Sequence, residues 1–201
     1  MPRVLLPKPL LFLILAAACS QATSAGSETP APQAQPDNPG PAFTDADVHF
    51  MSGMIAHHQQ AVVMGGWATD TAHGAGAAVR ALSARIVVGQ TDEIAALQRW
   101  LRERGQAAAE HAMMMPGMLT ADQLASLDAA RGTEFDRLFL TFMIQHHQGA
   151  LTMVDQLLAA QGAAQDGLVF RFAADVHADQ TTEIEFMRRM LAALPTGGTT
   201  R

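Results

Sequence analysis

Two adjacent histidines occur twice in this chain of 201 residues, within MIAHHQQAVVM and again within MIQHHQGALTM. The pairs are His57 with His58 and His146 with His147. A methionine stands three residues before each pair and another seven residues after its first histidine: Met54, Met64, Met143 and Met153. Imidazole and thioether groups together form a donor set that suits copper, especially Cu(I). The repeated motif therefore predicts copper binding, as Cu(I), Cu(II) or both, with another divalent metal as an open alternative.

A glutamate and a glutamine interrupt an apolar stripe in the segment that follows each motif. The segments are QTDEIAALQRWL from Gln90 and QTTEIEFMRRML from Gln180. At 100° per residue, Glu93 and Glu183 share a helix face with leucine, isoleucine or methionine. A buried carboxylate without a partner is costly, so the inward histidines are expected to answer these two glutamates. Each glutamate is then either a direct metal ligand or a hydrogen-bond acceptor that orients a histidine ring.

The two members of each histidine pair point in different directions. A narrow helical stripe runs through Phe50, Met54 and Ala61, and His57 lies at its centre while His58 lies at its edge. The second copy repeats this arrangement around His146. The central histidines are therefore expected to face a shared interior.

A further group of methionines lies between the two halves of the chain. HAMMMPGM, residues 111–118, contains four methionines and one histidine. Met115 and Met118 join the candidate ligands, because a methionine-rich loop can capture soft metal ions; the alternative is a hydrophobic lid over the end of the bundle. The remaining histidines point away from the stripes and are expected at the surface: His49, His73 and His177.

Helices must carry these residues. Three capping boxes mark helix starts, at Thr44 with Asp47, Thr120 with Gln123, and Thr133 with Asp136. Strand signals are absent from the sequence, which contains no tyrosine and no sustained alternation of apolar and polar residues. The expected helices span about 44–71, 76–104, 120–130, 133–161 and 167–193.

The internal repeat extends beyond the histidines. With the two motifs aligned, the matched positions are Asp47 with Asp136, Phe50 with Phe139, Ile55 with Ile144, and Ala61 with Ala150. The glutamine and glutamate segments also correspond. This pattern predicts an all-α four-helix bundle that is built from two duplicated helical hairpins and has a pseudo-twofold axis.

The N-terminal segment reads as an export signal. Arg3 and Lys8 precede an apolar run, and LAAAC follows it, so residues 1–18 are expected to be a lipoprotein signal peptide and Cys19 the lipidated residue. The alternative is a cleaved signal peptide with an incidental cysteine. Residues 19–42 are poor in large apolar side chains and predict a disordered linker, before a bundle domain at 43–195 and a flexible tail at 196–201. With a lipidated Cys19, the protein is expected to be anchored to a membrane and to face the periplasm or the cell exterior.

The charge excludes one class of partner. The chain has 13 basic and 19 acidic residues, and removal of Arg3 and Lys8 makes the balance more acidic. Such a chain is not expected to bind nucleic acid.

The motifs resemble those of the domain-of-unknown-function 305 family. The resemblance covers about residues 44–194 and rests on the two His-His-Gln motifs, MPGM and the two QTxEI segments. It implies a ferritin-like four-helix domain, common in secreted bacterial proteins, some of which are associated with copper binding and resistance. The first copy has Gln60 where the second has Gly149, a departure that removes no candidate ligand.

Sequestration or delivery of copper outside the cytoplasmic membrane is the leading interpretation, and an enzyme is the less favoured one. The alternatives are a ferritin-like metal-dependent oxidase, which would need more inward carboxylates than Glu93 and Glu183, and a metal-free helical scaffold in which histidines satisfy the glutamates. A copper-transfer protein as partner and a homo-oligomer stay open.

Overall fold

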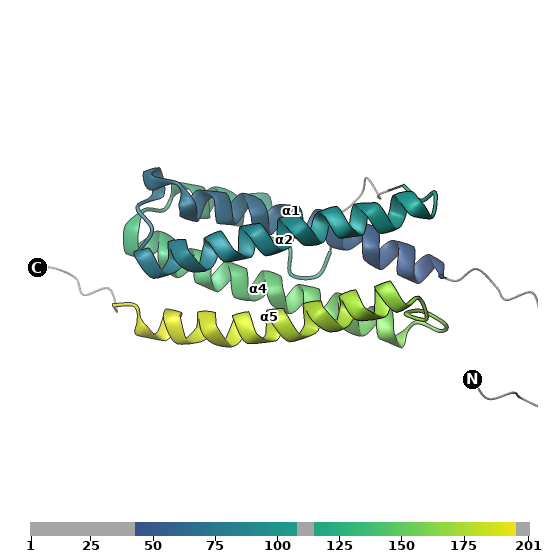
Figure 1. Ribbon diagram of the computed structural model, residues 1–201. Helices are drawn as coiled ribbons and strands as arrows, with labels where there is room; N and C mark the ends of the chain where they lie inside the picture. Colours follow the sequence, from purple (N-terminus) through teal and green to yellow (C-terminus); the bar gives the residue numbers. More distant parts are fainter. Residues whose placement is uncertain (1–42, 108–114, 196–201) are drawn as a thin grey trace, which may run out of the picture. The chain divides into compact units, whose positions relative to one another are not determined.

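The computed structural model describes residues 43–107 and 115–195, and all the regular elements in these ranges are helices. The four long helices are α1 (Asp45–Thr69), α2 (Ala77–Glu103), α4 (Gly132–Ala159) and α5 (Gly167–Ala193), which run alongside one another (Figure 1). Two short helices complete the order, η1 (Thr71–His73) and α3 (Ala121–Ala129). α1 packs against α2, α4 packs against α5, and α1 also packs against α4. The prediction of an all-α bundle made of two hairpins is confirmed.

Several sequence predictions fall outside the described ranges. These are the signal peptide at 1–18, the linker at 19–42 with Cys19, the tail at 196–201, and Met113 and Met114 of the methionine-rich segment. Within the described ranges, no helix is both long enough and apolar enough to span a membrane.

Two of the three predicted capping boxes are present. At the start of α1, the Asp47 N–H donates to Thr44 Oγ1 over 3.2 Å, and the Thr44 N–H donates to Asp47 Oδ2 over 2.7 Å. Thr120 and Gln123 form the same reciprocal pair at the start of α3. Because these boxes fix the helix starts locally, the expected helix ends agree with the observed ones to within two residues.

The third capping box, Thr133 with Asp136, is wrong. α4 begins at Gly132 with Arg131 as its N-cap, and Thr133 is an exposed residue inside the helix. The Asp136 carboxylate instead accepts the N–H of Gly76, with its two oxygens at 3.0 and 3.1 Å. Gly76 is the N-cap of α2 and has no side chain of its own, so a carboxylate from the other hairpin caps that helix.

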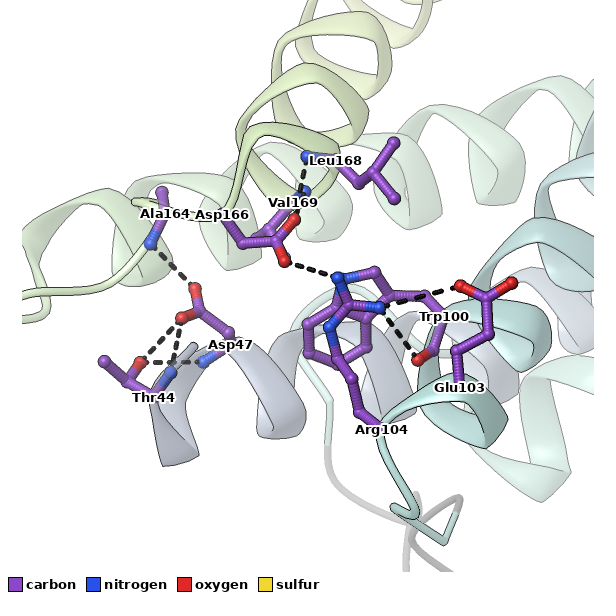
Figure 2. A network of polar contacts seen from close by, with 9 residues as sticks. All are labelled: Thr44, Asp47, Trp100, Glu103, Arg104, Ala164, Asp166, Leu168 and Val169. Carbon is purple, nitrogen blue, oxygen red and sulfur yellow. Dashed lines mark hydrogen bonds and ion pairs between the residues drawn. The ribbon is translucent and has the colours of Figure 1, made fainter. Parts of the chain in front are cut away.

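The first hairpin makes the equivalent contact to the second, with a carboxylate that accepts a backbone N–H. Asp47 is fully buried, and its Oδ1 accepts the N–H of Ala164 over 2.7 Å, in the connection between α4 and α5 (Figure 2). Asp47 and Asp136 are matched positions of the repeat, so each half supplies one carboxylate to the inter-helix connection of the other half. The duplication thus explains how the two hairpins are joined.

An ion pair reinforces the same end of the bundle. Arg104, at the end of α2, donates to Asp166 Oδ2 over 2.5 Å, and its guanidinium lies 4.3 Å from the centre of the Trp100 ring (Figure 2). Asp166 caps α5 by accepting the N–H groups of Leu168 and Val169. Desolvation raises the pKa of Asp166, but the bonds from Arg104 and these two N–H groups outweigh it, and the net pKa is lowered. The contacts therefore favour the charged carboxylate.

Replacing Asp136 with alanine is expected to destabilise the protein by about 1–3 kcal/mol, because the Gly76 N–H at the α2 terminus then loses its acceptor. Thr133→Ala is the matched control three residues away and should change the free energy of unfolding by less than about 0.5 kcal/mol, since Thr133 is exposed. Urea unfolding of both variants measures this difference. Equal losses would mean that the capping box predicted from the sequence forms after all.

The buried core has two apolar parts with a polar layer between them. One apolar cluster contains Phe50, Leu97 and Val154, and the other contains Leu82, Phe139 and Met187. Along all four long helices, the residues between these clusters include both His-His motifs and both Gln-x-x-Glu segments. We call this set the polar layer: His57, His58, Gln90, Glu93, His146, His147, Gln180 and Glu183.

Candidate metal centre

The two central histidines meet in the middle of the polar layer. His57 on α1 and His146 on α4 are both fully buried, and their ring centroids lie 3.8 Å apart with the planes tilted by 36°. The helical stripes placed both side chains inward, and the packing of α1 on α4 brings the rings into contact. Two matched histidines from the repeat therefore form one pair.

The nitrogen atoms of this pair have few partners. His57 Nε2 lies 3.0 Å from the carbonyl oxygen of Pro116, and because a carbonyl only accepts, Nε2 carries the proton. His57 Nδ1 is then an unprotonated nitrogen with a free lone pair. Neither His57 Nδ1 nor either ring nitrogen of His146 has a hydrogen-bond partner within residues 43–107 and 115–195.

Burial keeps both central rings neutral. Desolvation is the main cause that lowers the pKa of His57 from 6.5 to about 3; His58 lowers it further and the Pro116 carbonyl opposes the change. Desolvation, followed by the proximity of His57, also lowers the pKa of His146 well below 6.5. Neutral imidazole is the form that binds metal ions, so the pair needs no deprotonation near neutral pH.

The flanking histidines, not the central ones, contact the glutamates. His58 Nε2 lies 2.7 Å from Glu93 Oε2, and His147 Nε2 lies 2.7 Å from Glu183 Oε2. The second contact has hydrogen-bond geometry, whereas the first has the same length without good alignment. The expectation that the central histidines contact the glutamates is therefore wrong. A helical wheel does not show which neighbour a residue at the edge of a stripe contacts.

The glutamates are also less buried than the sequence suggested. The side chains of Glu93 and Glu183 keep 27% and 28% of their surface exposed. With Asp179 they line a cavity of about 200 Å³ between α2 and α5. Desolvation, then the charges of Glu93 and Glu183, raise the pKa of Asp179. Water in this cavity reaches the carboxylates, which is why they tolerate their place at the edge of the core.

Each flanking ring offers one nitrogen to the interior. A carboxylate beside Nε2 favours a proton on that nitrogen, so Nδ1 carries the lone pair. Nδ1 of His58 and of His147 is buried and, within the described part of the chain, has no hydrogen-bond partner. All four motif histidines thus hold a buried Nδ1 that no described residue pairs by a hydrogen bond.

The four motif methionines divide into two groups. Met54 and Met143 are fully buried one turn before the central histidines. Met64 and Met153 stand seven residues after them, about 10 Å further along their helices, in separate apolar clusters. Met54 and Met143 are therefore the motif thioethers nearest to the central histidines along their helices, and they too belong to separate apolar clusters.

The MPGM segment crosses the bundle beside the histidine pair. Met118 N–H donates to Met115 O over 3.3 Å, and Gly117 has φ +77°, which fits a type II turn with proline at its second position. The same turn supplies the Pro116 carbonyl to His57. Met115 and Met118 are partly buried. The segment therefore covers the middle of α1 and α4 and is not a lid over the end of the bundle.

The turn explains one of the differences between the motifs, Gln60 in the first copy against Gly149 in the second. A Cβ on Gly149 would overlap Pro116 O, so the turn can rest on α4 only where that helix has a glycine. In the other copy, Gln60 Oε1 accepts the Leu119 N–H over 2.7 Å and Gln60 Nε2 donates to Leu119 O over 3.2 Å. Gln60 on α1 thus bonds Leu119 just after the turn, while Gly149 on α4 makes room for Pro116 and Gly117 within it.

His73 is a further correction. The sequence placed it on the surface, but it is buried, and its Nε2 lies 3.0 Å from Asp128 Oδ1. It belongs to η1, a short element that the sequence did not predict, and it connects the end of the first hairpin helix to α3. His49 and His177 are exposed, as expected.

Gly149→Ala is expected to destabilise the protein by about 1–3 kcal/mol, because the added methyl group displaces the Met115–Met118 turn from α4. Gly66→Ala is the matched control, since Gly66 is an exposed helical glycine with nothing within 4 Å of an added Cβ. The control should be neutral or more stable by up to about 1 kcal/mol. Urea unfolding provides the measurement, and a Gly149→Ala variant as stable as the control would show that the turn does not need this contact.

Donor type limits what the polar layer can hold. Among the described residues, no three His, Cys, Asp or Glu side chains converge closely enough to hold a metal ion. A metal here needs thioether ligands in addition, or a low coordination number. Fold and site together define a class of protein. It is a helical bundle of two hairpins, and each hairpin contributes a matching pair of buried histidines to the centre.

Sequence similarity assigns the chain to a known protein family. Residues 47–191 match the family model described as Domain of unknown function (DUF305), and the chain belongs to this family. No protein of curated function matches it.

Solved structures of related chains share the fold. A DUF305 fragment from Deinococcus radiodurans is 30% identical, with 77% of this chain and 100% of that one covered and a TM-score of 0.67. A DUF305 protein from Streptomyces coelicolor is 27% identical, with 73% and 92% covered and a TM-score of 0.66. CopM in a Cu(I)-bound form is 26% identical, with 73% and 95% covered and a TM-score of 0.57. CopM is also known in a Cu(II)-bound form, 25% identical over the same shares, with a TM-score of 0.59.

Proposed function

We propose that this protein binds copper in the polar layer and sequesters it or passes it on outside the cytoplasmic membrane. The observation that carries the proposal is the set of four buried Nδ1 atoms without a hydrogen-bond partner among the described residues. A buried polar atom without a partner is unfavourable, and a metal ion that accepts its lone pair removes that cost. The central pair, His57 and His146, is the inner part of this site.

The donor set favours Cu(I). Neutral imidazole nitrogens and the thioethers of Met54 and Met143 are soft or borderline ligands, and the carboxylates of Glu93 and Glu183 contact the flanking histidines. Cu(I) accepts few ligands, which suits a layer where no three His, Cys, Asp or Glu side chains among the described residues converge. The related CopM, known in Cu(I)- and Cu(II)-bound forms, supports this choice of metal.

The flanking residues would act through orientation. Glu93 and Glu183 hold the proton on Nε2 of His58 and His147, which keeps each Nδ1 free for the interior. In this proposal the glutamates are hydrogen-bond acceptors, not direct ligands, because their carboxylates face the α2–α5 cavity. Bound copper without thiolate or carboxylate ligands would exchange readily, which suits transfer to another copper protein.

A Cu(I) titration of the detergent-solubilised full-length protein tests the proposal. A chromophoric Cu(I) chelator competes for the ion under anaerobic conditions, and parallel titrations use Cu(II), Zn(II) and Fe(II). We expect stoichiometric Cu(I) retention and weaker retention of Zn(II) and Fe(II). A protein that yields all its Cu(I) to a weak chelator would refute the proposed function.

The anchor is a separate proposal, since Cys19 lies outside the described residues. If Cys19 is lipidated after removal of residues 1–18, Cys19→Ala should move the protein from the membrane fraction to the soluble fraction. Fractionation followed by immunodetection measures this change, and circular dichroism checks that the helical domain still folds. A Cys19→Ala protein that stays in the membrane fraction would contradict the anchor and leave copper binding unaffected.

A further inference from the structure

An open cavity beside the polar layer contains three soft donors. It has a volume of about 420 Å³ and lies between α1, α4 and the Met115–Met118 turn. His49, Met115 and Met153 line it, and none of the described residues that line it is acidic; the others are Ala46, Phe50, Pro116, Gln156 and Leu157. From the described part of the chain, the cavity thus offers one imidazole and two thioethers.

The positions on α1 connect this cavity to the central histidines. His49, Gly53 and His57 follow at intervals of four residues, so they lie along one face of the helix. His49 is exposed and His57 is fully buried. The two histidines are eight residues apart, or about 12 Å along the helix axis. This face therefore leads from solvent to the histidine pair.

Gly53 makes room for a thioether between the two histidines. A Cβ at this position would lie 3.0 Å from Met115 Sδ, closer still to Met115 Cε, and 3.5 Å from Met153 Cε. The side chains of Met115 and Met153 thus meet over the bare backbone of Gly53. The next residue after Met115 is Pro116, whose carbonyl contacts His57. Soft donors therefore occur at each stage between the cavity mouth and the buried pair.

Building on the copper-binding function proposed above, we propose that His49, Met115 and Met153 form a capture site that takes up Cu(I) and passes it to His57 and His146. Neutral thioether and imidazole donors bind a soft monovalent cation, whereas hard divalent cations prefer oxygen donors. The step is a ligand exchange, so the ion keeps its oxidation state and no electron or proton source is required. His49 thereby gains a role that its exposed position alone does not suggest.

Methyl NMR of the full-length protein, labelled with ¹³C at the methionine methyl groups, separates the two sites. In a variant carrying His57→Ala and His146→Ala, one equivalent of Cu(I) should still shift the Met115 and Met153 signals and leave Met54 and Met143 unchanged. Met→Leu variants assign the signals. Unshifted Met115 and Met153 signals in that variant would overturn the capture site, whereas shifts at Met54 and Met143 in the unmodified protein support the central site. Shifts at Met115 and Met153 alone would support capture and contradict the proposed central site.

The rate of Cu(I) loading gives the second readout. His49→Ala and Met115→Leu should each slow loading from a chelated Cu(I) donor by at least tenfold in stopped-flow experiments. Gly53→Ala should also slow it, because the new methyl group displaces the flexible end of Met115. His177→Ala, at an exposed histidine on α5, and Gly66→Ala are the matched controls and should load at the original rate. Unchanged loading in both His49→Ala and Met115→Leu would overturn the proposal.

Discussion

His57→Ala and His146→Ala are each expected to weaken Cu(I) binding by at least tenfold, which corresponds to about 1.4 kcal/mol. Each substitution removes a neutral, fully buried imidazole from a pair whose rings are 3.8 Å apart. His58→Ala and His147→Ala should have smaller effects, because one nitrogen of each ring is engaged by a glutamate. Competition titrations with a Cu(I) chelator measure the four affinities, with helicity checked by circular dichroism.

The two central variants should also differ from each other. The duplication alone predicts equal losses, but the Pro116 carbonyl engages His57 Nε2, while both nitrogens of His146 are free of hydrogen-bond partners among the described residues. His146 can therefore present either nitrogen to copper, and His146→Ala should cause the larger loss. If copper affinity is unchanged in both central variants, the histidines serve the fold and its glutamates, and the copper proposal fails.

The fold was largely predictable because its determinants are local. The capping boxes at Thr44 and Thr120 set helix starts from residues three positions apart. The repeat then fixed the number of hairpins without any knowledge of distant contacts. Asp136 shows where this reasoning stopped: its partner is Gly76, 60 positions away in the other hairpin, and no local pattern distinguishes it from an ordinary capping residue.

The sequence identified the residues of the candidate site, but it did not predict which of their side chains contact each other. Helical periodicity identified His57 and His146 as inward residues, and the structure brings their rings together. It did not predict that Glu93 pairs with His58, because a helical wheel gives direction within one helix and not the rotation of one helix against another. The roles of Gly149 and Gln60 were not predicted for a similar reason. Both residues contact a loop whose path only the tertiary structure shows.

The free energy of unfolding of the metal-free protein is expected to fall steeply as the pH drops below 6.5. In the unfolded chain His57 and His146 take up protons near pH 6.5. In the folded protein they stay neutral, because burial lowers the pKa of His57 to about 3 and the pKa of His146 well below 6.5. Between about pH 6.5 and 3 the unfolded state binds more protons, so lowering the pH favours unfolding. Above pH 6.5 this contribution is complete and constant.

Each ring that stays neutral in the folded protein should remove stability with a slope that approaches about 1.4 kcal/mol per pH unit as the pH falls well below 6.5. Urea unfolding of the metal-free protein at pH 7, 6 and 5 measures the slope. A variant carrying His57→Gln and His146→Gln is the control, because it keeps a polar group at each position and loses the titration, so its stability should vary much less over the same range. Parallel pH profiles for the two proteins would mean that the central rings are protonated in the folded state, and that the buried pair is not the neutral metal-binding form on which the copper proposal depends.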